Sequence, residues 1–144
     1  MSVRSASSDD IAVISRLLSE FREIPVDESM VSEIFAAKFS DSSDRAVLLG
    51  QTDDGSVCGL CIVSMVYKLG ETECRIDNVV VSEQARGHGL GGQLLTAAKE
   101  WAWDHGADSI GFTSRPSREA ANRLYQRSGF PLHHTNAYKL KREE

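Results

Sequence analysis

The residues most suited to chemistry lie in the stretch 79–92, which reads VVVSEQARGHGLGG. Its four glycines fall within six residues, between a run typical of a strand and a run typical of a helix. Glycine inside a regular element costs about 0.5–1 kcal/mol relative to alanine, so a local requirement must offset that cost. Main-chain N–H groups in such a turn, at the positive end of a helix, bind anions, and Arg86 adds a charge there. The stretch indicates a phosphate-binding turn; glycines that serve only turning and packing are the alternative.

The spacing of Gly87, Gly89 and Gly92 also satisfies G-x-G-x-x-G, the fingerprint of dinucleotide-binding units. Five residues, 82–86, separate these glycines from the strand, whereas the turn of such units follows the strand directly. Such units also place an acidic residue about 20 residues after the glycines, at the end of the second strand. Asp108, the acidic residue nearest to that position, precedes the strand instead. Residues 93–144 are too few to complete a doubly wound sheet, and no Gly-Lys-Ser/Thr is present for a Walker-type loop. A nicotinamide oxidoreductase is therefore disfavoured.

Two motifs together resemble one known family. The run from Arg86 to Gly91, preceded by Gln84, resembles the pyrophosphate-binding motif of the GNAT superfamily of N-acetyltransferases. The stretch 121–130, ANRLYQRSGF, resembles that family's second signature, an Asn and a Tyr three residues apart on a helix that ends in Gly-Phe. The resemblance implies an α/β (mixed α+β) GNAT fold. Such a fold has a central, mostly antiparallel twisted sheet of six to seven strands flanked by four helices, in the order βααβββαβαβ.

The resemblance also implies a role for each site residue. Tyr125 matches the general acid that protonates the departing thiolate of CoA, and Asp77 matches the general base, which we place on the same strand face as Val79. The short side chain of Asp77 favours a water relay to the amine. A core aromatic at Tyr125 and an ion pair between Asp77 and Arg75 are the structural alternatives. The implied acetyl-CoA-binding residues are Val79, Val80, Val81, Gln84, Arg86, Gly87, His88, Gly89, Leu90, Gly91, Gly92, Asn122 and Tyr125.

Hydrophobic periodicity predicts the elements that position these residues. Ser7 and Asp10 form a variant of the capping box at the start of the first helix, whose apolar stripe includes Ile14 and Leu17. A second helix is expected over 28–39, a third over 91–105 and a fourth over 118–128. Strands are expected near 3–6, 45–51, 56–69, 74–82 and 109–114, with one or two short strands closing the chain over 130–141.

Composition and cysteine spacing exclude several classes of function. Lys and Arg number 16 against 21 Asp and Glu, a net charge of −5, which disfavours a nucleic-acid partner. The chain lacks the roughly 20-residue apolar run that a membrane span needs, and its start lacks the layout of a signal peptide. Cys58 and Cys61 form a C-x-x-C within a strand, where alternating faces separate the sulfurs, and Cys74 leaves an odd number. We therefore expect a cytoplasmic protein without a metal.

The prediction is a single N-acetyltransferase domain over 1–144. It transfers acetyl from acetyl-CoA to a primary amine of a small molecule or peptide, by direct attack in a ternary complex, and a homodimer is compatible with the sequence. The alternative is a non-catalytic acyl-CoA-binding regulatory module, which Tyr125 and Asn122 disfavour. The acidic residues of the segment 20–28, including Glu20, would attract a cationic amine; the alternative is a solvated acidic loop.

Overall fold

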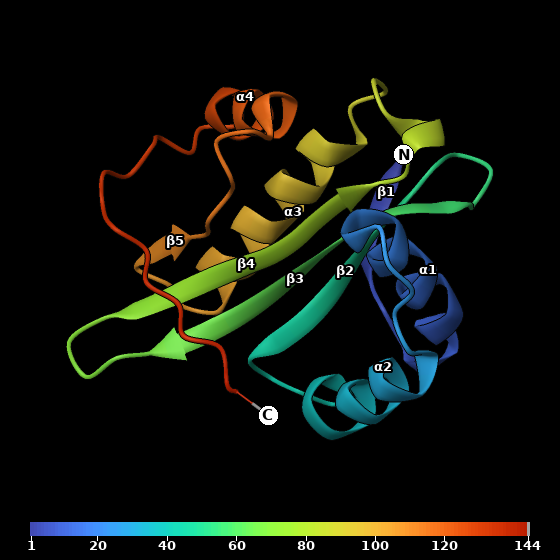
Figure 1. The fold of residues 1–144 in the computed structure, drawn as a ribbon, viewed down its shortest axis with the longest axis horizontal. Helices are drawn as coiled ribbons and strands as arrows, with labels where there is room; N and C mark the ends of the chain where they lie inside the picture. The colour runs from blue at the N-terminus through green and yellow to red at the C-terminus, as the bar shows by residue number, and fades with distance from the viewer. Residues whose placement is uncertain (144) are drawn as a thin grey trace.

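The computed structural model describes residues 1–143, which form one sheet with helices on both faces (Figure 1). The sheet order is β1-β2-β3-β4-β5, antiparallel throughout except for the parallel pair β4 and β5. The elements are β1 (Ser2–Ser5), α1 (Ile11–Arg22), α2 (Glu28–Ile34), β2 (Arg45–Gln51), β3 (Val57–Tyr67), β4 (Thr72–Val81), α3 (Leu90–Asp104), β5 (Ser109–Gly111) and α4 (Glu119–Arg127). A π-helical turn, Phe35–Phe39, extends α2 to the predicted end of the second helix. The mixed, mostly antiparallel α+β fold with four helices is confirmed.

The prediction of six to seven strands is wrong for the described residues. The sheet has five strands, and residues 130–143, where one or two strands were expected, carry no regular structure. Phe130 packs against the core of the α3 face, but the large apolar residues after it find no surface to pack on: Leu132 is 72% exposed, Tyr138 89% and Leu140 96%. Without burial, nothing offsets the conformational entropy lost when a strand forms. The observed order is therefore βααβββαβα.

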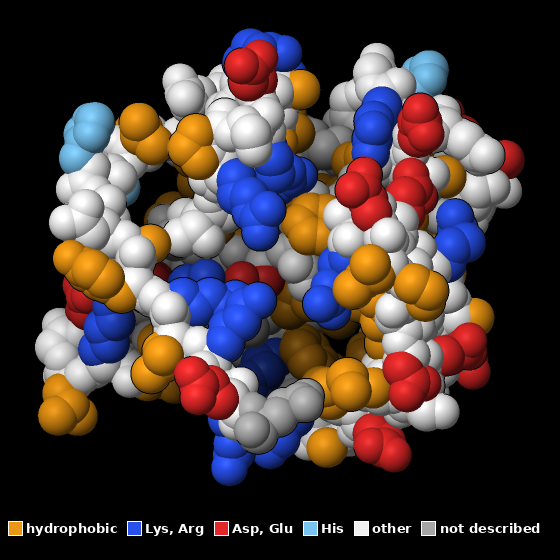
Figure 2. Space-filling view, in the orientation of Figure 1, with side chains coloured by type: hydrophobic (Ala, Val, Ile, Leu, Met, Phe, Trp, Pro, Cys, Tyr) orange, Lys and Arg blue, Asp and Glu red, His pale blue; other side chains and the backbone are white. Residues whose placement is uncertain are grey.

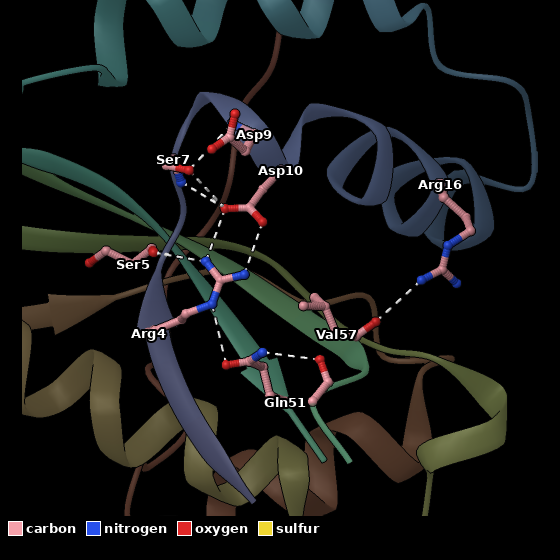
Figure 3. A network of polar contacts seen from close by, with 9 residues as sticks. Arg4, Ser5, Ser7, Asp9, Asp10, Arg16, Gln51 and Val57 are labelled. Atoms are coloured by element: carbon pink, nitrogen blue, oxygen red, sulfur yellow. Dashed lines mark hydrogen bonds and ion pairs between the residues drawn. The ribbon is translucent and has the colours of Figure 1, made fainter. Parts of the chain in front are cut away.

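The predicted capping box forms at the 3-10 turn Ser8–Asp10, which leads directly into α1, and it is tied to the sheet (Figure 3). The Ser7 side chain accepts a hydrogen bond from Asp9, and the Asp10 carboxylate accepts one from the Ser7 N–H at 2.8 Å. Asp10 also accepts from both terminal nitrogens of Arg4 on β1, each at 2.9 Å. This hydrogen bonding by Arg4 is the main reason why the pKa of Asp10 lies below its usual value. The cap therefore fixes the start of α1 against β1.

Each face of the sheet has its own core. Figure 1 shows α3 and α4 on one side of the sheet and α1 and α2 on the other. The α3 face buries Leu94, Leu95, Ala98 and Ala102 of α3 against the side chains of β2, β3 and β4. The α1 face buries Ile14 and Leu17, the predicted stripe of α1, together with Phe35, Val47, Leu49, Leu60 and Val80. Side chains of β4 thus enter both cores.

Candidate active site

The main chain of β4 is open on its β5 side at its C-terminal end. β5 pairs with β4 only at Glu73, Cys74 and Arg75, and within residues 1–143 no strand pairs with that edge of β4 beyond them. The Ser82 N–H donates to the Cys58 carbonyl at 2.7 Å, so in an antiparallel ladder the polar groups of Val81 point away from β3. The Arg86 Nε accordingly donates to the Val81 carbonyl at 3.1 Å. The main chain of Val81 on the predicted edge of β4 is therefore available for a ligand, with Arg86 beside it, and the role of Val79 stays a prediction.

A β-bulge in β4 separates the side chains of Asp77 and Val79. Asn78 has φ +52°, and the register with β3 shifts between Leu60 and Ile62. Asp77 lines a cavity on the α1 face, whereas Val79 packs into the core of the α3 face. The prediction that Asp77 and Val79 share a face is therefore wrong, because the extra residue of the bulge reverses the alternation.

The glycines of the turn before α3 serve different purposes. Gly87 and Gly89 have φ of +83° and +85°, a region that side-chain-bearing residues rarely adopt. A Cβ at Gly91 would meet the Leu124 side chain at 2.8 Å, so this glycine allows α3 and α4 to approach closely. A Cβ at Gly92 would have nothing within 4 Å. Packing explains Gly91, and it leaves Gly92 without a structural reason to be glycine.

The start of α3 presents unpaired main-chain donors. Its N-cap, Gly89, provides no side-chain hydrogen bond, and the first intrahelical bond runs from Gln93 N–H to the Gly89 carbonyl at 3.1 Å. The N–H groups of residues 90–92 therefore have no intrahelical partner. The side chain of Leu90 is 1% exposed, so this residue offers a ligand only its main chain. The side chains of Gln84 and His88 are exposed beside the turn.

Tyr125 packs in the core of the α3 face with its hydroxyl still accessible. The residue is 6% exposed, and its ring meets Phe112 edge-on at 4.7 Å between centroids. Within residues 1–143 its hydroxyl has no hydrogen-bond partner, and the single buried side-chain polar atom without a partner is Ser114 Oγ. The exposed part of Tyr125 therefore includes the hydroxyl, which is free to donate.

Asn122 holds the segment between β5 and α4. Its Nδ2 donates to the Arg115 carbonyl at 2.9 Å, which leaves its side-chain oxygen for a ligand. Ser114 lies in the same segment, and its buried, unpartnered hydroxyl is a candidate that sequence reasoning missed. A lone Ser in a polar run gives no signal by itself, because burial is what distinguishes it.

Asp77 makes the ion pair with Arg75 that was the structural alternative to its role as general base. Its carboxylate accepts from Arg75 Nε at 3.2 Å. It also lines a cavity of about 510 Å³, bounded by α2, the π-helical turn and strands β2, β3 and β4. In the acidic segment before α2, Glu20 accepts a hydrogen bond from the Glu83 N–H at 2.9 Å and fastens the turn after β4 to α1.

The cysteines are free thiols, and two of them are sealed in the core. Cys61 and Cys74 are both 0% exposed, and Cys58 is half-buried. Burial raises the pKa of Cys61 to about 12 and that of Cys74 to about 11.

The part of the chain that the structure describes contains no group of three or more His, Cys, Asp or Glu arranged to hold a metal ion. Over the same residues, none of the helices has the length and apolar character of a membrane span.

The mostly antiparallel sheet, with a parallel pair beside a glycine-rich helix start, matches the α+β arrangement that the two sequence motifs imply. The comparisons with known proteins agree. A model of the Acetyltransferase (GNAT) family matches residues 11–130, and the chain belongs to this family. It is an acetyl-CoA-dependent N-acetyltransferase.

The relatives span nearly the whole chain. An uncharacterized N-acetyltransferase of Bacillus subtilis is 24% identical, with 90% of this chain and 89% of the relative covered. An aminoalkylphosphonate N-acetyltransferase of Salmonella typhimurium is 28% identical, with coverages of 92% and 86%. The solved structure of a Trypanosoma brucei acetyltransferase is similar at a TM-score of 0.79 and 20% identity, over 96% of this chain and 98% of that one. The structural likeness supports the fold.

Proposed function

We propose that residues 1–144 act as a single domain that transfers the acetyl group of acetyl-CoA to a primary amine, by direct attack in a ternary complex. One observation carries the proposal: the unpaired edge of β4 ends beside the uncapped start of α3. A pantetheine arm has main-chain partners along the β4 edge, and a pyrophosphate has N–H donors at the start of α3. Arg86 links the two features, because it lies in the turn before α3 and its Nε donates to the Val81 carbonyl at the end of β4.

The residues of the chain fit acetyl-CoA. The main chain of Val79 and Val81 would pair with the pantetheine arm, and the turn from Gln84 to Gly92 would hold the pyrophosphate. The open space at Gly92 supports this assignment, because a Cβ there would meet no protein atom. Acetyl-CoA supplies the thioester whose carbonyl carbon the amine attacks and whose C–S bond breaks.

Asp77 and Tyr125 divide the proton transfers in this proposal. An amine with an ordinary pKa near 10 arrives protonated, and Asp77 accepts its proton through a water molecule. As the nitrogen–carbon bond forms and the carbon–sulfur bond breaks, the Tyr125 hydroxyl donates its proton to the sulfur. The nitrogen loses its second proton to solvent, and solvent restores the Tyr125 proton. Because Asp77 and Tyr125 lie on opposite faces of the sheet, the amine approaches from the α1 face and the thiolate leaves toward α4.

The experiment is a screen for CoA release from acetyl-CoA over amines. The panel contains amino acids, polyamines, aminoglycosides, peptides and, because of the Salmonella relative's name, aminoalkylphosphonates. We expect stoichiometric CoA and N-acetyl product with at least one amine. Tight acetyl-CoA binding without turnover on any amine would favour the regulatory module instead.

A further inference from the structure

A row of basic side chains crosses the α1 face of the sheet next to Asp77. The strand register places Arg45 of β2 opposite Ser64 of β3, and Ser64 opposite Arg75 of β4. Adjacent strands lie about 4.8 Å apart, so the three side chains are neighbours. Lys38, from the π-helical turn after α2, lines the same cavity as Arg45 and Ser64. Four residues that are distant in sequence therefore form one group, which we call the cation row.

The donors of the cation row are largely unused. Within residues 1–143, the side chains of Lys38 and Arg45 make no hydrogen bond or ion pair, and the Ser64 hydroxyl has no partner. Arg75 donates only its Nε to Asp77, which leaves its terminal N–H groups available. Figure 2 shows Lys and Arg side chains around the hollow in the middle of this face. Arg45 and Arg75 lie on either side of Ser64 with Lys38 beside the same cavity. Like charges gathered on one face repel each other, and a bound anion would lower that cost.

A negative pole lies beside the positive one. Asp77 is two residues from Arg75 on β4 and pairs in register with Ile62, so it lies roughly 7 Å farther along the strand than the cation row. The cavity that contains both poles has a volume of about 510 Å³, which is within the usual range for small-molecule sites. Ile34, Phe39 and Ile62 give it an apolar wall. Its volume and the placement of its charges suit a short molecule with a cation at one end and an anion at the other.

We propose that the acceptor is a small zwitterion, an amine that also carries a carboxylate or phosphonate. This inference rests on the proposed acetyl transfer and names the substrate class of that site. The anion binds Lys38, Arg45, Ser64 and the free end of Arg75. The ammonium group points toward Asp77, where it loses its proton next to the open edge of β4. The cation row thereby selects the acceptor and sets its direction.

The test compares three amines of similar size: 2-aminoethylphosphonate, β-alanine and propylamine. We expect kcat/KM to be at least tenfold higher for one or both anionic amines than for propylamine, and the two anionic arms separate phosphonate from carboxylate recognition. Arg45→Gln and Lys38→Gln should each raise KM for the preferred anionic amine at least fivefold and shrink its advantage over propylamine. Lys68→Gln is the matched control, because Lys68 pairs with Glu71 on the β3–β4 turn and lies outside the cavity.

A second readout does not depend on turnover. The melting temperature of the wild-type protein should rise with 2-aminoethylphosphonate or β-alanine, and the shift should shrink in Arg45→Gln. Two results would overturn the zwitterion proposal. The first is that propylamine is acetylated as well as the anionic amines, and the second is that neither anionic amine shifts the melting temperature or is acetylated. Failure of the proposed function is recognised separately, since no amine of the screening panel would then release CoA, whereas failure of the zwitterion proposal alone leaves turnover on an amine that carries no anion.

Discussion

The two faces of the sheet bury different chemistry, and the helices that cover them explain the difference. α3 is 15 residues long and buries six of them, and under it lie apolar side chains such as Val63 and Ile76. α2 is seven residues long and buries none of its own, and beside it the strands expose Arg45, Ser64 and Asp77 to the cavity. A long helix seals its face, whereas a short one leaves room for a ligand.

The comparison also assigns steps of the reaction to faces. Tyr125 belongs to the closed face and Asp77 to the open one, and the unpaired edge of β4 is reached from both. A water-excluding face suits the donor of a proton to sulfur, and a solvated face suits a charged acceptor that must enter and leave.

The largest effect is expected at Tyr125. Replacement by Phe keeps the ring and its edge-on contact with Phe112 but removes the hydroxyl, so kcat should fall about 10²–10⁴-fold, the usual contribution of a positioned acid. The acetyl-CoA Kd from calorimetry should stay within about twofold, because the main chain and the glycine turn supply that binding. Wild-type kcat on the identified amine would remove Tyr125 from the mechanism, and a large rise in Kd would make it a structural residue.

The next effect measures how differently the two faces are packed. Leu95→Ala on α3 should lower the free energy of unfolding by about 2–5 kcal/mol, because Leu95 is 0% exposed. Ile34→Ala on α2 should change it by less than about 0.5–1 kcal/mol, because Ile34 is 49% exposed. Urea unfolding of both variants gives the comparison. Equal losses would show that α2 is packed as tightly as α3.

A smaller effect separates ligand approach from backbone strain in the glycine turn. Gly87 and Gly89 have positive φ, so any side chain there strains the turn whether or not a ligand binds. Gly92 is helical with empty space around it, and Val in a helix is no worse than Gly. Gly92→Val should therefore fold normally yet weaken acetyl-CoA binding at least tenfold, about 1.4 kcal/mol.

The control for that variant is Gly70→Val. Gly70 also has nothing within 4 Å of an added Cβ, and it lies in the β3–β4 turn. Its acetyl-CoA affinity should match the wild type by calorimetry. Equal affinity of Gly92→Val and the control would locate the pyrophosphate elsewhere.

Local patterns predicted the elements well because their causes are local. The capping box of Ser7 and Asp10, and the stripe with Ile14 and Leu17, depend on residues within a few positions of each other. The terminal strands failed because alternation shows that residues suit a strand, and not that a surface exists to bury Tyr138 or Leu140. The sequence alone could not distinguish a terminal strand from a loop over residues 130–141.

The site was predictable where a motif is contiguous and not where the register assembles it. The glycine turn and Tyr125 were proposed from contiguous motifs, and their roles stay predictions. The bulge was missed because Val79, Val80 and Val81 suit either face of the sheet. The Asn at position 78 was a signal, because Asn is depleted in strands and tolerates positive φ. The cation row joins residues from a π-helical turn and three strands, and only the pairing of Arg45 with Ser64 and Ser64 with Arg75 reveals it.

The smallest effect concerns the thiols, which report how well the closed face excludes solvent. Only a thiolate attacks a disulfide reagent, and burial raises the pKa of Cys61 to about 12 and that of Cys74 to about 11. A thiol-specific disulfide reagent at pH 7.5 should therefore modify one thiol quickly in the native protein, the half-buried Cys58, and the other two only after unfolding in guanidinium. Cys58→Ser should abolish the fast phase. Two or three fast thiols in the native protein would mean that solvent enters beneath α3, and the contrast between a sealed face and an open one would then be lost.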